Sequence, residues 1–473
     1  MPPHDVIRLT CRQQCDQERP SCSQCIRHGV VCDGYDRRVK FVNGYPEKKR
    51  TAVVSVSPLE KLHRADPCAL AVGRTILNKA AYECQYVDVF WEAYLPYSRA
   101  ASPLAAQYST TGWTAIAQRL YPDHELLKLA LGAFSFCAVG RKSDDEWMMV
   151  KGRSLYGMAL QEMARALRSS EKNGANDDVI IIASKILNLF EVFFETNHDD
   201  KLAQYKIWFS HSAGEEALFL RRGPAAYATG DAHYLLEDGR LQMAILDMMN
   251  RKRSFLSSPE WKTIPWQGID KTPKDTLLDI FVDIPEVLEG LDALYGLDDN
   301  PPKRDHLRHS FLERVTGYER ELQNWYEQTS RTDPWICVDT SHPRNEVGLA
   351  GAHLMALYWS ARLALFNTRR LPIFPTNKAQ NMADAEVFKE RIMPLIARLT
   401  EEKSGWFGRQ AAVFPGGAAN CMFVSLYDEG QRDLEVDKLT ELFGAMESTA
   451  ISPTFLGCQN SGTGRAKPIS AGR

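Results

Sequence analysis

Five of the eleven cysteines fall within twenty-two residues near the amino terminus: Cys11, Cys15, Cys22, Cys25 and Cys32. The segment that contains them has no periodic pattern of apolar residues, so we expect no hydrophobic core in it. A stretch of this kind needs a metal ion or a covalent cross-link to hold one structure. The spacing of these cysteines therefore limits the fold of this part of the chain more than any other feature.

The sequence context favours a metal over disulfides. The first residues, MPPHDVIRLT, lack the apolar run of a secretory leader, and the most apolar stretch, 179–194, is too short to span a bilayer. We therefore expect an intracellular protein without a membrane partner, in which clustered cysteines hold metal. Zinc takes four thiolate or imidazole ligands, and cysteines separated by two residues, as Cys22 and Cys25 are, can chelate one ion. The predicted cofactor is zinc, and its predicted ligands are Cys11, Cys15, Cys22, Cys25 and Cys32.

These residues resemble the DNA-binding module of fungal zinc-cluster (Zn2Cys6) transcription regulators. That module has a cysteine pair, a basic stretch, a third cysteine followed by Asp, an Arg-Pro, a second cysteine pair, and a last cysteine near Gly-Tyr. The matching residues, in order, are Cys15-Asp16, Arg19-Pro20, Cys22, Cys25, and Cys32 with Gly34-Tyr35. Residues 9–12 resemble the approach to the second cysteine. The resemblance covers residues 9–35.

The sequence departs from the family pattern in two places. Arg8 stands where the first cysteine of the family would lie, and three residues rather than six separate Cys11 from Cys15. In the family, the missing stretch forms the helix that contacts bases in the major groove, commonly at CGG triplets. The first and fourth cysteines of the family bridge two zinc ions, and this chain has a counterpart only for the fourth, Cys22.

A single zinc ion is compatible with the cysteines that are present. Its ligands would be Cys22, Cys25, Cys32 and either Cys11 or Cys15, with His28 as a substitute. Two explanations of the departures stay open: a short exon portion is missing from the coding sequence as read, or the module is degenerate. We favour the first, because every residue after Cys15 keeps the pattern.

Basic residues concentrate in the same part of the chain. Residues 1–50 hold ten Lys or Arg and six Asp or Glu, a net charge of +4, so the remaining residues bring the whole chain to −3 by carrying −7. A basic head on an acidic body suits DNA, because Lys and Arg neutralise phosphates without reading sequence. The residues predicted to contact DNA are Arg12, Arg19, Arg27, Arg37, Arg38 and Lys40.

The rest of the chain predicts helices. From about residue 77 apolar residues recur every three or four positions, and strict two-residue alternation is hard to find. The predicted helices span 126–139, 147–167, 179–194, 202–220, 241–256, 276–294, 307–326, 347–366 and 387–399. We predict a mostly α protein in four parts: a small zinc-cluster module at 9–35, a basic linker at 36–75, a large all-α regulatory domain at 76–456, and a disordered tail at 457–473.

One segment of the body adds to the resemblance. Residues 205–224 resemble a recurring part of the helical regulatory region attached to many fungal zinc-cluster proteins, through Trp208, His211, Gly214, Leu218 and Arg222-Gly223-Pro224. The same apolar side chains are also expected simply as core. We find no Gly-rich phosphate loop, Gly-x-Ser-x-Gly turn or His-Glu-x-x-His pair, and therefore expect no enzymatic activity.

The resemblance implies a regulator of RNA polymerase II genes in a fungal nucleus, often for a metabolic pathway or a clustered biosynthetic set. The expected partners are double-stranded DNA with CGG-type sites, the transcription machinery and a second copy of the chain. Dimerisation stays open, because no heptad run of three or more repeats follows the linker. The competing interpretation is a degenerate family member that no longer binds DNA and acts through protein or effector contacts.

Overall fold

The computed structural model describes residues 87–95, 97, 100–173, 177–194, 201–296, 301–336, 344–371, 373–375 and 377–443. The chain divides into two units, 1–66 and 67–473, and all described residues lie in the second. The predicted zinc-cluster module at 9–35, the linker at 36–75 and the tail at 457–473 lie outside the described residues.

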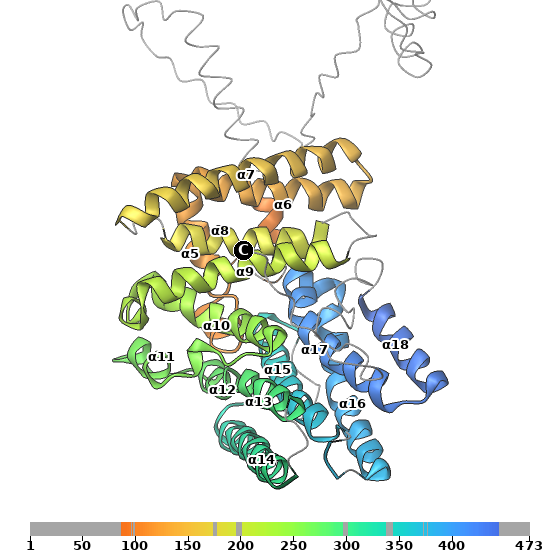
Figure 1. The fold of residues 1–473 in the computed structure, drawn as a ribbon. Coiled ribbons are helices and arrows are strands. Elements are labelled where there is room, and N and C mark those ends of the chain that lie inside the picture. Colours follow the sequence, from red (N-terminus) through yellow and green to blue (C-terminus); the bar gives the residue numbers. More distant parts are fainter. Residues whose placement is uncertain are drawn as a thin grey trace, which may run out of the picture. The chain divides into compact units, whose positions relative to one another are not determined.

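The described residues are mostly helical and include no strand (Figure 1). This confirms the expected all-α character of the body. Residues 87–94 are helical, and the longer helices that follow are α5 (Trp113–Leu120), α6 (Glu125–Ser143), α7 (Glu146–Asn173), α8 (Asp177–Phe194), α9 (Lys201–Arg222), α10 (Gly230–Asn250), α12 (Pro273–Phe281), α13 (Ile284–Tyr295), α14 (Pro301–Thr332), α15 (Glu346–Arg369), α16 (Lys378–Thr400), α17 (Gly405–Leu426) and α18 (Glu429–Phe443). Shorter turns are α4 (Pro103–Ala106), η1 (Tyr121–Asp123), η2 (Pro224–Tyr227), η3 (Phe255–Ser257), α11 (Pro259–Thr263), η4 (Ile264–Trp266) and η5 (Glu402–Ser404).

Two predicted helices differ from the observed ones. The helix predicted at 241–256 begins eleven residues earlier in the structure and ends at Asn250, because Arg251 takes a left-handed φ of 52° that terminates α10. The single helix predicted at 276–294 is two helices, α12 and α13, and Pro285 lies in the first turn of α13, where its missing N–H costs nothing. Helices α17 and α18 were not predicted.

One edge of the body is a stack of four helices. α7 packs on α6, α6 on α8, and α8 on α9, as the upper part of Figure 1 shows. The α6–α7 contact depends on Gly152, since a Cβ placed there would lie 2.3 Å from Cys137 Sγ and 2.9 Å from the Ala133 carbonyl oxygen. A side chain of any size would force the two helices apart.

A second group of helices packs around α15. This helix contacts α16 and α17, and those two contact each other. Among the described residues α15 is the one helix long and apolar enough to cross a membrane by length and composition, and 83% of its most apolar window is buried inside the body. It is therefore the central core helix of this group.

Aromatic side chains join the two groups. Trp406 at the start of α17 lies 4.7 Å from Phe193 and 5.2 Å from Phe194, both at the end of α8, and 5.6 Å from Phe134 of α6, measured between ring centroids. Phe134 also meets Phe90 of the 87–94 helix edge to face at 4.9 Å. Such contacts add to the hydrophobic free energy of the buried rings.

Candidate functional site

None of the predicted zinc ligands and none of the predicted DNA contacts lies within the described residues. These are Cys11, Cys15, Cys22, Cys25 and Cys32 for zinc, and Arg12, Arg19, Arg27, Arg37, Arg38 and Lys40 for DNA. In the described part of the chain, no group of three or more His, Cys, Asp or Glu side chains is arranged to hold a metal ion. The assigned roles of these eleven residues therefore stay predictions.

The segment that resembles the family's regulatory region forms α9 and the turn that follows. Leu218 is buried, and Arg222 Nη1 donates to Asp178 Oδ1 at 2.6 Å while its guanidinium lies 4.8 Å from the Tyr227 ring centroid. Gly223, with φ of 71°, ends the helix, and Pro224 opens η2. The Arg222-Gly223-Pro224 sequence thus marks the end of α9.

The most unusual site in the described body is a buried group of charges at one end of α12. The charge cluster consists of Glu237, Asp238, Arg240, Lys271, Lys274, Asp275 and Asp279. At its centre the Lys274 ammonium, 1% exposed, lies 2.9 Å from Glu237 Oε1 and 2.9 Å from Asp238 Oδ1. Lys274 Nζ also donates to the Ser109 carbonyl oxygen at 3.0 Å. All three ammonium protons therefore have acceptors.

Asp238 links the charge cluster to the start of α5. Its Oδ2 accepts a hydrogen bond from the Trp113 backbone N–H at 2.7 Å. The backbone can come this close because residue 112 is glycine: a Cβ there would lie 3.2 Å from Asp238 Oδ2. A carboxylate at the start of a helix accepts from a backbone N–H that has no partner within the helix, and its negative charge is stabilised by the positive end of the helix dipole.

A second set of contacts extends the charge cluster toward Trp266. Arg240, 1% exposed, ion-pairs with Asp279 and lies 3.6 Å from Asp275 Oδ1. Its guanidinium is 4.6 Å from the Trp266 ring centroid, and the ammonium of Lys271, which also ion-pairs with Asp279, is 4.8 Å from the same centroid. Two cations thus share one aromatic ring and one carboxylate.

Asp275 also fixes the beginning of α12. Its backbone N–H donates to the Thr272 hydroxyl at 3.3 Å, while its Oδ2 accepts from the Thr272 N–H at 3.0 Å. This is a capping box, followed by Pro273 at the first helical position. The cap fixes the first turn of α12, and this turn carries Lys274, whose ammonium contacts Glu237 and Asp238 of α10.

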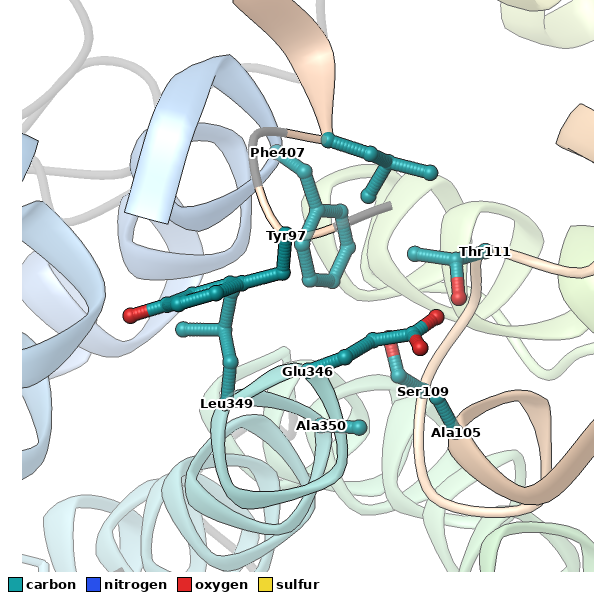
Figure 2. A pocket seen from close by; sticks show the side chains of 9 residues that line it. Tyr97, Ala105, Ser109, Thr111, Glu346, Leu349, Ala350 and Phe407 are labelled. Carbon is teal, nitrogen blue, oxygen red and sulfur yellow. The ribbon is translucent and has the colours of Figure 1, made fainter. Parts of the chain in front are cut away.

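A narrow crevice lies next to the charge cluster, because Ser109 lines the crevice and its carbonyl oxygen accepts from Lys274. Figure 2 shows the Glu346 carboxylate directed toward Thr111 and Ser109, with the rings of Tyr97 and Phe407 nearby. Glu346 Oε1 accepts from the Ser102 N–H at 2.7 Å, and the Ser109 hydroxyl lies 3.4 Å from His353 Nδ1. Ser109 thus belongs to both sites, since its carbonyl oxygen accepts from Lys274.

The crevice is too small for an organic ligand. Its volume is about 10 Å³, which is about the room that one water molecule needs. The polar side chains of Ser109, Thr111 and Glu346 are among its lining, so a single water molecule is what its size and chemistry would fit. Hydrogen bonds to Asp238 of α10, Lys274 of α12 and Glu346 of α15 hold the 102–113 segment against these three helices.

Burial sets the protonation of the groups around Lys274. Desolvation, followed by the charge of Lys274, lowers the pKa of His353 to about 3, so this imidazole is neutral near pH 7. Desolvation raises the pKa of Glu237 to about 7. The attraction of Lys274 opposes this rise, and repulsion from Asp275 and Asp238 adds to it. For Lys274, burial lowers the pKa, but the three surrounding carboxylates outweigh it and raise the pKa above its usual range.

Sequence reasoning did not identify the charge cluster. One signal for it is visible in hindsight: Leu235-Leu236-Glu237-Asp238-Gly239-Arg240-Leu241 places three charged residues inside an apolar helical run. Charged side chains there must be buried, and buried charges need partners. The sequence does not indicate that the partners come from residues 271–279.

The chain resembles an uncharacterized protein of Emericella nidulans, with 30% identity over 135 residues, which is 28% of this chain and 27% of that protein. The chain therefore matches about a quarter of that relative's length. No protein-family model matches the chain, and no solved structure matches it.

Proposed function

We propose that this protein is a zinc-cluster transcription regulator that binds promoter DNA at CGG-type sites and controls RNA polymerase II genes in the nucleus. The observation that carries the proposal is the ordered set of Cys15-Asp16, Arg19-Pro20, Cys22, Cys25 and Cys32 with Gly34-Tyr35. Thiolates at these spacings can hold zinc, and zinc binding supplies the folding free energy that a segment without a core lacks.

Two further features of the chain support the proposal. The described body is all-α, as the resemblance to fungal regulators implies. The basic residues around the cysteines give the head a charge opposite to that of DNA, while the remaining chain is acidic. The acidic body would not itself attract DNA, so contact would be confined to the head.

The alternative function is that of a regulator without DNA binding. It is favoured by one specific observation: three residues separate Cys11 from Cys15, where the family has a six-residue basic stretch that reads bases. Without that stretch, Lys and Arg contacts to phosphates remain but base contacts do not. The chain would then act through protein or effector contacts and not through DNA.

The full-length chain, purified with zinc, tests both functions. We expect at least one zinc ion per chain by metal analysis, lost in Cys22→Ser and Cys25→Ser and kept in Cys68→Ser, a cysteine outside the cluster. Fluorescence anisotropy should show binding to a CGG-containing duplex that weakens steeply with salt and exceeds binding to a scrambled duplex. No preference for CGG would select the alternative function, and absence of zinc would reject the proposed zinc cluster.

A further inference from the structure

A second cleft lies between α14, α15 and α16, away from the charge cluster. Its volume is about 270 Å³, close to the lower end of the range of small-molecule sites. It is lined by side chains from all three helices, beginning with Glu319 of α14, Arg362 of α15 and Asp384 of α16. The cleft therefore has room for a small organic molecule, which the crevice near Ser109 lacks.

The part of the cleft near Arg362 is positive. The Arg362 guanidinium lies 5.2 Å from the Trp359 ring centroid and 5.8 Å from that of Tyr358. Its Nη1 donates to Gln323 Oε1 at 3.2 Å and to the Tyr358 hydroxyl at 3.1 Å. Among the described residues no carboxylate lies within ion-pair distance of Arg362, and Nε and Nη2 have no acceptor. These contacts hold the Arg362 side chain in place, and its Nε and Nη2 groups remain able to donate to a ligand.

The part of the cleft near Arg369 is negative. Arg369 Nη1 lies 3.3 Å from Glu319 Oε2, and Asp384 Oδ1 accepts only a neutral hydrogen bond, from Gln380 Nε2 at 2.8 Å. Two carboxylates and one guanidinium give this end a net charge of −1. Burial raises the pKa of Glu319. The attraction of Arg369 and Arg362 lowers it in part, and repulsion from Asp384 raises it further. A cation placed here would relieve the repulsion.

An apolar floor joins the two ends. Arg362 and Arg369 are seven residues apart on α15, or about 10 Å along the helix axis. Phe366 lies between them, and its ring centroid is 5.1 Å from that of Phe388 on α16. Val387, 52% exposed, belongs to the same wall. The cleft thus presents a guanidinium, an apolar surface and a carboxylate pair, in that order.

From this arrangement we propose that the cleft binds a small zwitterion whose carboxylate and protonated amine are separated by a short apolar chain. The carboxylate pairs with Arg362, the amine with Asp384 and Glu319, and the chain lies over Phe366 and Phe388. A plain carboxylate would pair with Arg362 but leave Asp384 without a cation. A plain amine would leave the spare donors of Arg362 unpaired. The proposal concerns the helical body alone and is independent of DNA binding.

Three probes of equal length test the proposal on the full-length chain by isothermal titration calorimetry: 6-aminohexanoate, hexanoate and hexylamine. We expect saturable binding of 6-aminohexanoate in the millimolar range or tighter, and binding of the other two weaker by about tenfold or more, because each lacks one charge-assisted contact. Equal affinity for all three, or no saturable binding of 6-aminohexanoate, overturns the proposal.

Variants locate the bound probe. Arg362→Gln and, separately, Asp384→Asn should each weaken binding of 6-aminohexanoate by about tenfold. Arg320→Gln, on the exposed surface of the neighbouring helix α14, is the matched control and should leave it unchanged. Asp384 is half-buried, so its variant keeps the test valid should Arg362→Gln unfold. Unchanged affinity in Asp384→Asn, or in a folded Arg362→Gln, places the probe elsewhere and rejects the site.

Discussion

Lys274 is the cation that balances the carboxylates of α10. With this side chain removed, Glu237 and Asp238 would stay buried with no nearby ammonium, and taking charges out of water without a partner is costly. We therefore expect Lys274→Met to lower the free energy of unfolding by about 3–5 kcal/mol, measured by urea denaturation.

The matched control for this substitution is Lys438→Met on α18. Lys438 makes a similar ion pair, 3.0 Å from Glu435 Oε1, but its side chain is 50% exposed. Glu435 is buried but keeps a second cation, Lys389 at 3.7 Å, so losing the half-exposed Lys438 should cost only about 0–1 kcal/mol. Equal losses of stability in the two variants would contradict the role given to Lys274.

Asp247 on α10 predicts a pH dependence of stability. It is 4% exposed, its Oδ2 has no hydrogen-bond partner among the described residues, and burial, followed by repulsion from Glu216, raises its pKa to about 7. In the unfolded chain an aspartate has a pKa near 3.9. The folded state therefore binds the proton more tightly, and the ionised form destabilises it progressively between about pH 4 and pH 7, in full above that.

The substitution Asp247→Asn removes that charge. Relative to the natural chain, we expect the variant to gain about 1–3 kcal/mol of stability as the pH rises from about 5 to about 8. Asp270→Asn, at an exposed position, should show little such change. Urea denaturation at the two pH values measures it. A constant difference between the Asp247 variant and the natural chain would show that the carboxyl titrates as it does in water.

At the scale of elements, the α6–α7 contact depends on one missing side chain. Gly152→Ala places a methyl group against Cys137 Sγ and the Ala133 carbonyl, and such overpacking costs about 1–3 kcal/mol. Gly157→Ala on the same helix meets nothing within 4 Å, so it should be neutral or stabilise by about 1 kcal/mol through helix propensity. Thermal unfolding of both variants checks the pair. A stable Gly152→Ala protein would mean that α7 can shift outward freely.

The helices themselves were largely predictable because apolar periodicity is local information. α6, α7, α8, α9, α14, α15 and α16 all contain the stretches predicted for them. The errors fall where local pattern is insufficient. Buried apolar residues recur every three or four positions from α12 into α13, so the break before Ile284 leaves no gap in the periodicity: Leu277, Phe281, Ile284, Val287 and Leu291. α17 carries Pro415, followed directly by Gly416 and Gly417, inside a helix that packing against α15 and α16 maintains.

At the scale of the whole molecule, neither site in the body was predictable from the sequence. The partners of Lys274 are Ser109, Glu237 and Asp238, up to 165 residues away. The cleft on α15 likewise needs side chains from α14 and α16. A sequence shows which residues are charged and which face of a helix is apolar, but not which helices will meet. The zinc ligands are the opposite case, since their whole pattern lies within a short segment.

The long separations within the charge cluster also dictate an order of events during synthesis. The ribosome releases Ser109 first, then Glu237 and Asp238, and only later Lys274 and His353. Until Lys274 emerges, the carboxylates of α10 have no buried counter-ion and are better left in water. The first half of the body therefore cannot complete its interior while it is being translated. Its final closure waits for α12 and α15, and contacts between residues this far apart predict slower folding than a bundle with local contacts would show.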